Sequence, residues 1–337
     1  MGERGTRTCR SEDTFCERTK GAHYFSPLRI DSAYPGNMTA DIALKSGRYH
    51  AWITSLGGGI RGLTLGGKNL TDTYAAGTPA PLACGVMLGP WPNRTADGIF
   101  SHRGHIYRLP INEPERNNAI HGFIGNAEWE VKAATPDSAH LEYMLEPQSG
   151  WPWRMKFENH YQLSDDGLAC TTRVTNMSRH HIPFGIGVHT YINAQDAPLN
   201  DCTLHVPASE RLPLDPDRNL PCGPLASVAG TQFDLQNRPL AGTWLDDAFT
   251  VAKAAKIECS VMNSRNTGSK LWFDGSFGWV QVYTAPDFPG RGRAVAIEPM
   301  TCPPNALRTG VGLIYLQPGE HWEASWGVAG VGGEGKK

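Results

Sequence analysis

The segment RAVAIEPMT, residues 293–301, contains one carboxylate in otherwise apolar text. As an extended strand it would place Glu298 on the same face as Ala294 and Ala296, whose small side chains leave room above the sheet. Pro299 restrains Glu298 to an extended backbone. A carboxylate in such surroundings is costly unless it is paired or functional. We therefore interpret Glu298 as a candidate acid–base group, the alternative being a structural ion pair.

The segment PFGIGVHTY, residues 183–191, offers a possible partner for this carboxylate. Strand alternation would place Gly185, Gly187 and His189 on one face. Glycine inside a strand often marks the close approach of a ligand or of another backbone. An imidazole beyond two glycines is what a shallow pocket with an acid–base group needs, although His189 could also be a structural histidine.

The segment GPWPNR, residues 89–94, is made rigid by two prolines. The rigid backbone therefore fixes the direction of Arg94, whose guanidinium can bind sugar hydroxyls or a carbonyl oxygen. Asn93 and the flat side chain of Trp91 are further candidates for contacts with a small polar ligand. The alternative is an exposed surface arginine.

Two more segments combine polar and apolar residues in the same way. In AIHGF, residues 119–123, His121 follows an apolar strand end, where a structural role is also common. In WLDDAF, residues 244–249, Asp246 could bind sugar hydroxyls between flanking aromatic residues such as Trp244, or could belong to a turn.

The elements that position these residues are predicted to be strands. Short β-prone runs recur between turn signals, and Arg103-Gly104 in FSHRGHIY predicts a hairpin. No amphipathic helix longer than two turns and no fixed repeat is present. This pattern predicts an all-β protein, a large antiparallel β-sandwich forming one domain over residues 38–330. Residues 1–37 are charged and aperiodic, which predicts a disordered or loosely packed extension, and 331–337 a flexible tail.

The composition limits the classes of partner. The chain has 31 lysines and arginines and 33 aspartates and glutamates, which gives a net charge of -2. This balance provides no electrostatic basis for binding nucleic acid or an acidic membrane. No apolar run approaches the roughly 20 residues that span a bilayer, and the first residues do not resemble a secretory signal. The 8 cysteines show no spacing typical of a metal site, which predicts free thiols in a reducing compartment. We therefore expect a cytoplasmic protein.

Seven segments resemble, in order, the motifs of the aldose 1-epimerases, also called galactose mutarotases. They are GPWPNR, IHGF, GVHTYINA, LDDAF, VQVYT, AIEPMTCPPNAL and LQPGEHW. Each is weak alone, but their common order over residues 57–327 is specific. The resemblance implies a large twisted β-sandwich, a galactose mutarotase-like supersandwich, whose broad concave sheet holds a sugar.

The resemblance also implies roles for single residues. Glu298 resembles the catalytic base and His189 the catalytic acid. Arg94 and His121 resemble substrate-binding residues, and Asp246 the aspartate that binds a hydroxyl. The chain departs from the family pattern at two positions, since Asp247 stands where histidine is usual and Asn305 where aspartate is common. These departures bear on which sugar is bound.

The reaction implied is the interconversion of α and β anomers of a free hexose or related aldose by acid–base ring opening. It needs one base and one acid, and no metal or other cofactor. The expected partner is a small sugar, and the expected state a monomer or weak homodimer. Activity should follow a bell in pH, and an anionic pocket predicts a raised pKa for His189.

Three other functions remain open at this stage. A glycoside hydrolase would pair Glu298 with Asp246 or Asp247 as two carboxylates flanking the bond. A carbohydrate-binding protein would keep the pocket without turnover. A metal site formed by Glu298, His121 and His189 has suitable ligand types, but the metal would occupy the nitrogens that acid catalysis needs.

Overall fold

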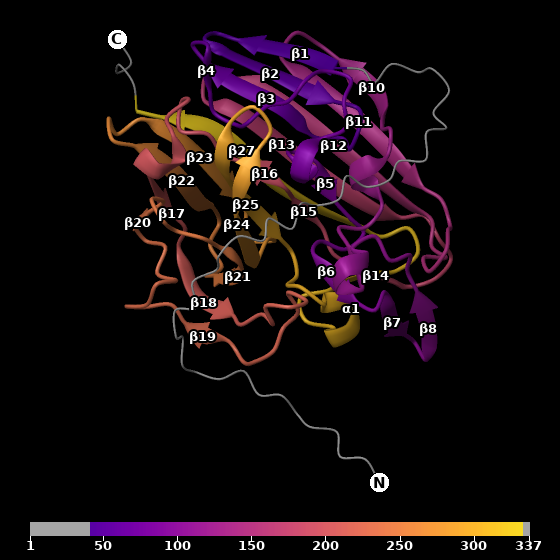
Figure 1. The fold of residues 1–337 in the computed structure, drawn as a ribbon. Helices are drawn as coiled ribbons and strands as arrows, with labels where there is room; N and C mark the ends of the chain where they lie inside the picture. Colours follow the sequence, from indigo (N-terminus) through magenta and orange to yellow (C-terminus); the bar gives the residue numbers. More distant parts are fainter. Residues whose placement is uncertain (1–40, 333–337) are drawn as a thin grey trace.

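The computed structural model describes residues 41–332, and nearly all regular structure in this range is β-strand (Figure 1). The α-helix α1 (Ala306–Thr309) has only four residues. The all-β antiparallel fold predicted from the sequence is therefore confirmed. The predicted extension 1–37 and residues 333–337 of the predicted tail lie outside the described residues. Short 3-10 turns occur at η1 (Pro81–Ala83), η2 (Pro114–Arg116), η3 (Ile124–Asn126) and η4 (Leu199–Asp201).

The largest sheet has nine strands. Its neighbouring strands all pair antiparallel. In β12 the inward side chains of Met155 and Phe157 alternate with the outward Lys156. In spatial order the strands are β10 (Glu130–Ala134), β11 (Ser138–Leu145), β12 (Met155–Ser164), β13 (Gly167–Asn176), β27 (His321–Val331), β23 (Gly268–Phe273), β22 (Ile257–Asn263), β17 (Cys202–His205) and β20 (Arg238–Pro239).

An eight-stranded sheet forms the opposite layer and carries the candidate acid–base residues. Its order is β19 (Ala226–Ser227), β18 (Ala208–Leu212), β21 (Asp246–Val251), β24 (Trp279–Phe288), β25 (Gly292–Met300), β15 (Gly187–Val188) and β5 (Met87–Leu88), with β16 (Thr190–Tyr191) also paired to β25. The alternation expected in β25 is confirmed. Val295 and Ile297 join the main core, whereas Ala294 and Ala296 belong to a separate small cluster on the other face.

Smaller sheets complete the domain. A four-stranded sheet packs against β11 and β12 and consists of β1 (Asp41–Ser46), β2 (Tyr49–Thr54), β3 (Ile60–Leu65) and β4 (Lys68–Asn69). Two-stranded ribbons pair β6 (Arg94–Ala96) with β9 (Asn118–Ile120), β7 (Ile99–His102) with β8 (His105–Arg108), and β14 (Ile182–Phe184) with β26 (Ile314–Leu316). The hairpin predicted at Arg103-Gly104 joins β7 and β8, and both turn residues have positive φ, at 49° and 78°.

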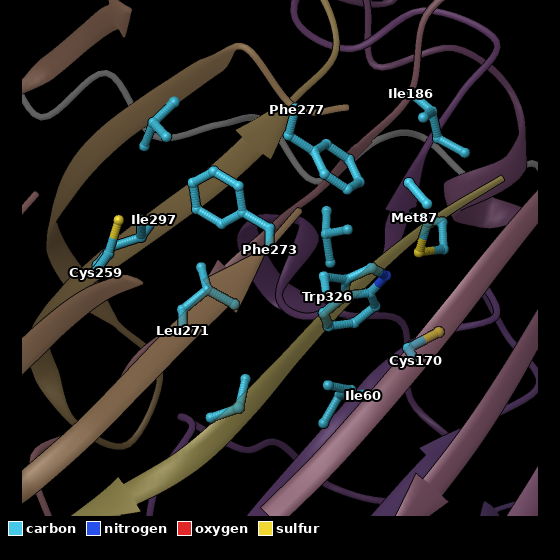
Figure 2. Close-up of a cluster of buried hydrophobic side chains, with 14 of the residues drawn as sticks. Ile60, Met87, Cys170, Ile186, Cys259, Leu271, Phe273, Phe277, Ile297 and Trp326 are labelled. Atoms are coloured by element: carbon cyan, nitrogen blue, oxygen red, sulfur yellow. The ribbon is translucent and has the colours of Figure 1, made fainter. Parts of the chain in front are cut away.

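The main core lies between the large sheets. Figure 2 shows Phe273 of β23 and Trp326 of β27 in one cluster with Met87 of β5 and Ile297 of β25, all 0% exposed. Burying one large apolar side chain stabilises the fold by about 1.5–3 kcal/mol. This continuous core makes the eight-stranded sheet a rigid base for the polar residues on its other face.

The cysteines depart in part from the expectation of free thiols. No helix within residues 41–332 is long and apolar enough to cross a bilayer. Five buried cysteines are free: Cys84, Cys170, Cys202, Cys259 and Cys302. Cys222 is disulfide-bonded, so the prediction that the cysteines are free thiols is wrong at this position.

Candidate active site

A polar pocket lies on the face of the eight-stranded sheet that points away from the main core. Glu298 pairs in register with Gln281, and Asp246 pairs with Tyr283. Because Gln281 and Tyr283 are two residues apart on β24, the three strands β21, β24 and β25 direct these side chains to one face. The pocket is lined by Asn93, Arg94, His121, His189, Asp246, Gln281, Tyr283 and Glu298. Six of the seven site residues predicted from the sequence are thus brought together.

Glu298 and His189, which both line the pocket, lie close enough to act as an acid–base pair. Glu298 Oε1 lies 3.3 Å from His189 Nε2, and the two residues are only 2% and 5% exposed. Burial raises the pKa of Glu298 well above its ordinary value, and the charge of Asp246 raises it further, while Arg94 lowers it. Burial lowers the pKa of His189 to about 4, against a smaller upward effect of Asp246. The expected upward shift for His189 is therefore wrong, because desolvation outweighs the anionic neighbours.

These opposite shifts define the protonation state of the pair. Between about pH 4 and the raised pKa of Glu298, the unliganded pair holds one proton, and that proton resides on Glu298. Transfer of this proton to His189 would give a carboxylate and an imidazolium without any change in the total proton count. The two groups can thus supply a base and an acid together over a wide pH range.

His121 is positioned as a neutral hydrogen-bond donor. It follows β9 with a positive φ of 63°, and the backbone N–H of Asn93 donates to its Nδ1 at 3.2 Å. The accepting Nδ1 leaves the proton on Nε2. Burial lowers the pKa of His121 well below its ordinary value, and His189 and Arg94 lower it further. Gly122 allows this geometry, because a Cβ there would collide with the backbone of Gly89.

Arg94 is buried rather than exposed, at 5%. Its Nε and Nη2 donate to both carboxylate oxygens of Glu113 at 2.9–3.0 Å. Asn305 holds the strand that carries Arg94: its backbone N–H donates to Arg94 O at 2.6 Å, and its Oδ1 accepts from Ala96 N at 3.1 Å. The position where the family often has aspartate therefore has a positioning role here.

The Arg94–Glu113 pair predicts a large stability effect. Glu113→Ala would leave the Arg94 charge buried without its partner, which should destabilise the fold by about 3–5 kcal/mol. Urea unfolding measures this difference. The matched control is Glu323→Ala, which breaks the half-exposed pair with Arg173 and should cost about 0–1 kcal/mol. Equal costs for the two variants would contradict a structural role for Glu113.

Asp246 is oriented from two sides. Gln281 Nε2 donates to its Oδ1 at 2.7 Å, and Asn219 Nδ2 donates to its Oδ2. Asp247 is not in the pocket, because its carboxylate accepts a hydrogen bond from Arg211 Nε at 2.7 Å. The second aspartate of the LDDAF segment is therefore half of an ion pair beside the site.

Two tryptophans proposed as flat surfaces for a sugar lie elsewhere, and the prediction for Trp91 needs correction. Trp91 is 2% exposed and packs in the core against Phe123, with ring centroids 5.0 Å apart, so it does not line the pocket. Trp244 is 58% exposed and lies under the guanidinium of Arg293. Trp91 therefore belongs to the core beside the pocket residues of its segment.

The glycines of residues 183–191 serve packing within the protein. A Cβ at Gly187 would lie 3.1 Å from Pro92 Cβ and from Met300 Cγ, and one at Gly185 would collide with Cys302 Sγ and lie 3.0 Å from Pro92 Cδ. The close approach expected from these glycines is therefore made by protein, by the GPWPNR segment on one side and by residues 299–302 on the other.

Comparison with known proteins places this arrangement in a family. The family model for aldose 1-epimerase matches residues 41–328, so the chain belongs to the aldose 1-epimerase family. The protein YihR of Escherichia coli (strain K12), itself uncharacterized, is 31% identical over 284 residues, covering 83% of this chain and 89% of that protein. The galactose mutarotase of Mus musculus is 30% identical over 168 residues, 48% of each chain.

Solved structures show the same fold. A galactose mutarotase-like protein from Clostridium acetobutylicum superposes with a TM-score of 0.76 at 22% identity, covering 86% of this chain and 94% of that one. The galactose 1-epimerase from Lactobacillus acidophilus gives a TM-score of 0.70 at 19% identity, covering 87% and 95%. Both support the galactose mutarotase-like β-sandwich expected from the sequence.

Proposed function

We propose that this protein is a mutarotase that interconverts the α and β anomers of a free aldose. The observation that carries the proposal is the buried pair of Glu298 and His189, 3.3 Å apart, at the base of a pocket with further polar groups from His121, Arg94 and Asp246. Membership of the aldose 1-epimerase family supports an isomerase acting on a sugar.

In the proposed reaction, Glu298 as carboxylate removes the proton of the anomeric hydroxyl. His189 as imidazolium protonates the ring oxygen, so the C1–O bond of the ring breaks and an open-chain aldehyde forms. Rotation about C1–C2 and the reverse transfers close the ring as the other anomer. Each transfer requires an oxygen within about 2.6–3.2 Å of its acid or base.

The other residues of the pocket bind and orient the sugar. His121 donates from Nε2 to a sugar oxygen, which a neutral imidazole can do without losing its proton. Asp246, fixed by Gln281 and Asn219, accepts hydrogen bonds from sugar hydroxyls. Arg94 contributes a positive charge beside the pocket that favours the carboxylate form of Glu298.

Polarimetry over a panel of free aldoses tests the proposal. Freshly dissolved α-anomers should reach their equilibrium rotation faster with the protein than in buffer, for at least one sugar of the panel. Failure to accelerate any aldose that the protein binds would favour a carbohydrate-binding protein without turnover.

A glycoside hydrolase remains a second candidate, because Glu298 and Asp246 both line the pocket. Asp247, the other carboxylate considered for that role, is paired with Arg211. Incubation with α- and β-nitrophenyl glycosides separates the two functions. The mutarotase proposal predicts no release of nitrophenol, since its reaction needs a free anomeric hydroxyl.

We expect chelators to leave mutarotation unchanged. The proposed reaction proceeds by proton transfer among Glu298, His189 and the sugar, and no step requires a metal ion. Activity is measured before and after dialysis against EDTA, with a dialysis control in buffer alone. Loss of activity that zinc restores would show that the cluster of His121, His189 and Glu298 works as a metal site.

A small sugar is the proposed partner. A cytoplasmic location and a monomeric or weakly dimeric state remain predictions, which cell fractionation and light scattering after gel filtration would test.

A further inference from the structure

A second group of metal-type ligands lies on the outer face of the nine-stranded sheet, apart from the pocket. His140 of β11 pairs in register with His160 of β12, and Glu158 lies two residues before His160, so the three side chains share one face. Their ligand atoms all lie within 4.8 Å of one another. We propose that this cluster is a binding site for a divalent transition-metal ion, Zn²⁺ in particular, with water completing the coordination.

The donor set fits this ion, and its side chains lie close enough to converge on one. Two imidazoles and one carboxylate are ligands that Zn²⁺ takes, at about 2.0–2.2 Å, with a water in an open fourth position. His140 Nε2 lies 3.9 Å from Glu158 Oε1, and the two imidazole rings stack with centroids 3.8 Å apart. The β11–β12 ladder fixes the backbone positions, so ion binding would bring the ligand atoms together by side-chain rotation, for which the exposed His160 has room.

His140 provides a second observation, independent of the spacing of the cluster. Its Nε2 is buried and has no hydrogen-bond partner, which is costly for a ring nitrogen beside a carboxylate. A metal ion bound by this nitrogen would satisfy it.

A neighbouring lysine competes with a metal ion for the carboxylate of Glu158. Lys156 Nζ lies 3.1 Å from Glu158 Oε1 and 3.7 Å from Glu142 Oε2, so its ammonium occupies the position a cation would take. Arg173, the register partner of Glu158 on β13, is engaged by Glu323 at 2.7 Å. Lys156 is therefore the cation that a metal must displace.

The test is a Zn²⁺ titration of the full chain by calorimetry, in the His189→Asn background, which removes the metal-type cluster in the pocket. We expect one zinc site in this background. Adding His160→Gln should weaken its affinity at least tenfold, because one of three protein ligands is lost. Adding Lys156→Met instead should strengthen it about threefold, because the competing ammonium is removed.

Two results would overturn the proposal: no zinc binding in the His189→Asn background, or the same affinity with and without His160→Gln. Co²⁺ gives a second readout in the same His189→Asn background, where the pocket cluster does not contribute. Its visible absorption should appear on binding and should be lost in His160→Gln and in Glu158→Gln. His160 is exposed on the sheet surface, so thermal unfolding of His160→Gln without metal should match that of the unsubstituted protein.

Discussion

Glu298→Gln is expected to lower kcat for anomer interconversion by at least about a hundredfold, the range of effects that loss of a positioned general base produces. The amide keeps the shape of the side chain and can still accept a hydrogen bond, but it cannot take the proton of the anomeric hydroxyl. Glu298 is fully buried in a preformed pocket, so the isosteric change should not disturb the sheet. Equilibrium exchange between the two anomers measures the rate.

The matched control is Glu258→Gln, which neutralises a surface carboxylate that pairs with Lys256 and Lys270. This variant should retain the full rate. Circular dichroism on both variants separates a chemical effect from unfolding. If Glu298→Gln folds normally and keeps a rate close to that of the unsubstituted protein, Glu298 has no role as the base.

The second large effect concerns His189 and pH. In the unsubstituted protein kcat/KM should show a plateau that begins near pH 4, where the pair would otherwise gain a second proton on His189. The plateau should end at the raised pKa of Glu298, where the pair loses its only proton. His189→Gln should lose at least about a hundredfold in rate. It should also show a single ascending limb, since Glu298 alone must then be ionised to act.

The shape of the profile makes this prediction specific. The descending limb of the unsubstituted protein requires a proton shared by the pair, so it should vanish when the imidazole is removed. His121→Gln is the control, because His121 is proposed to bind the sugar as a neutral donor; its variant should bind more weakly but keep both limbs. A descending limb that survives in His189→Gln would make another group the acid, with His121 the first candidate.

The alternation of side chains along a strand is the signal from which most of the candidate site could be predicted. The two-residue period placed Glu298 opposite the core-facing Ile297, and the fold confirms this division because β25 separates two hydrophobic clusters. Gln281 and Tyr283 also line the pocket, and the same alternation in VQVYT could have indicated them as neighbours of Asp246 and Glu298.

The sequence does not indicate which distant residues hold the site residues in place. Glu113 reaches Arg94, and Asn219 reaches Asp246, through loops that carry no periodic signal. The prediction for Trp91 is wrong because an aromatic residue beside a site residue can equally face the core. The direction of the His189 pKa shift failed for a related reason: neighbouring charges are visible in a sequence, whereas the degree of burial that outweighs them is a property of the folded pocket.

The most direct test of the central proposal is exchange NMR on an equilibrium mixture of the anomers of an aldose that the protein binds. Exchange cross-peaks between the α and β anomeric protons should build up with protein concentration, should be lost in Glu298→Gln, and should be absent for the corresponding methyl glycoside. Exchange at the buffer rate for every bound aldose would contradict the assignment of this pocket as a mutarotase site.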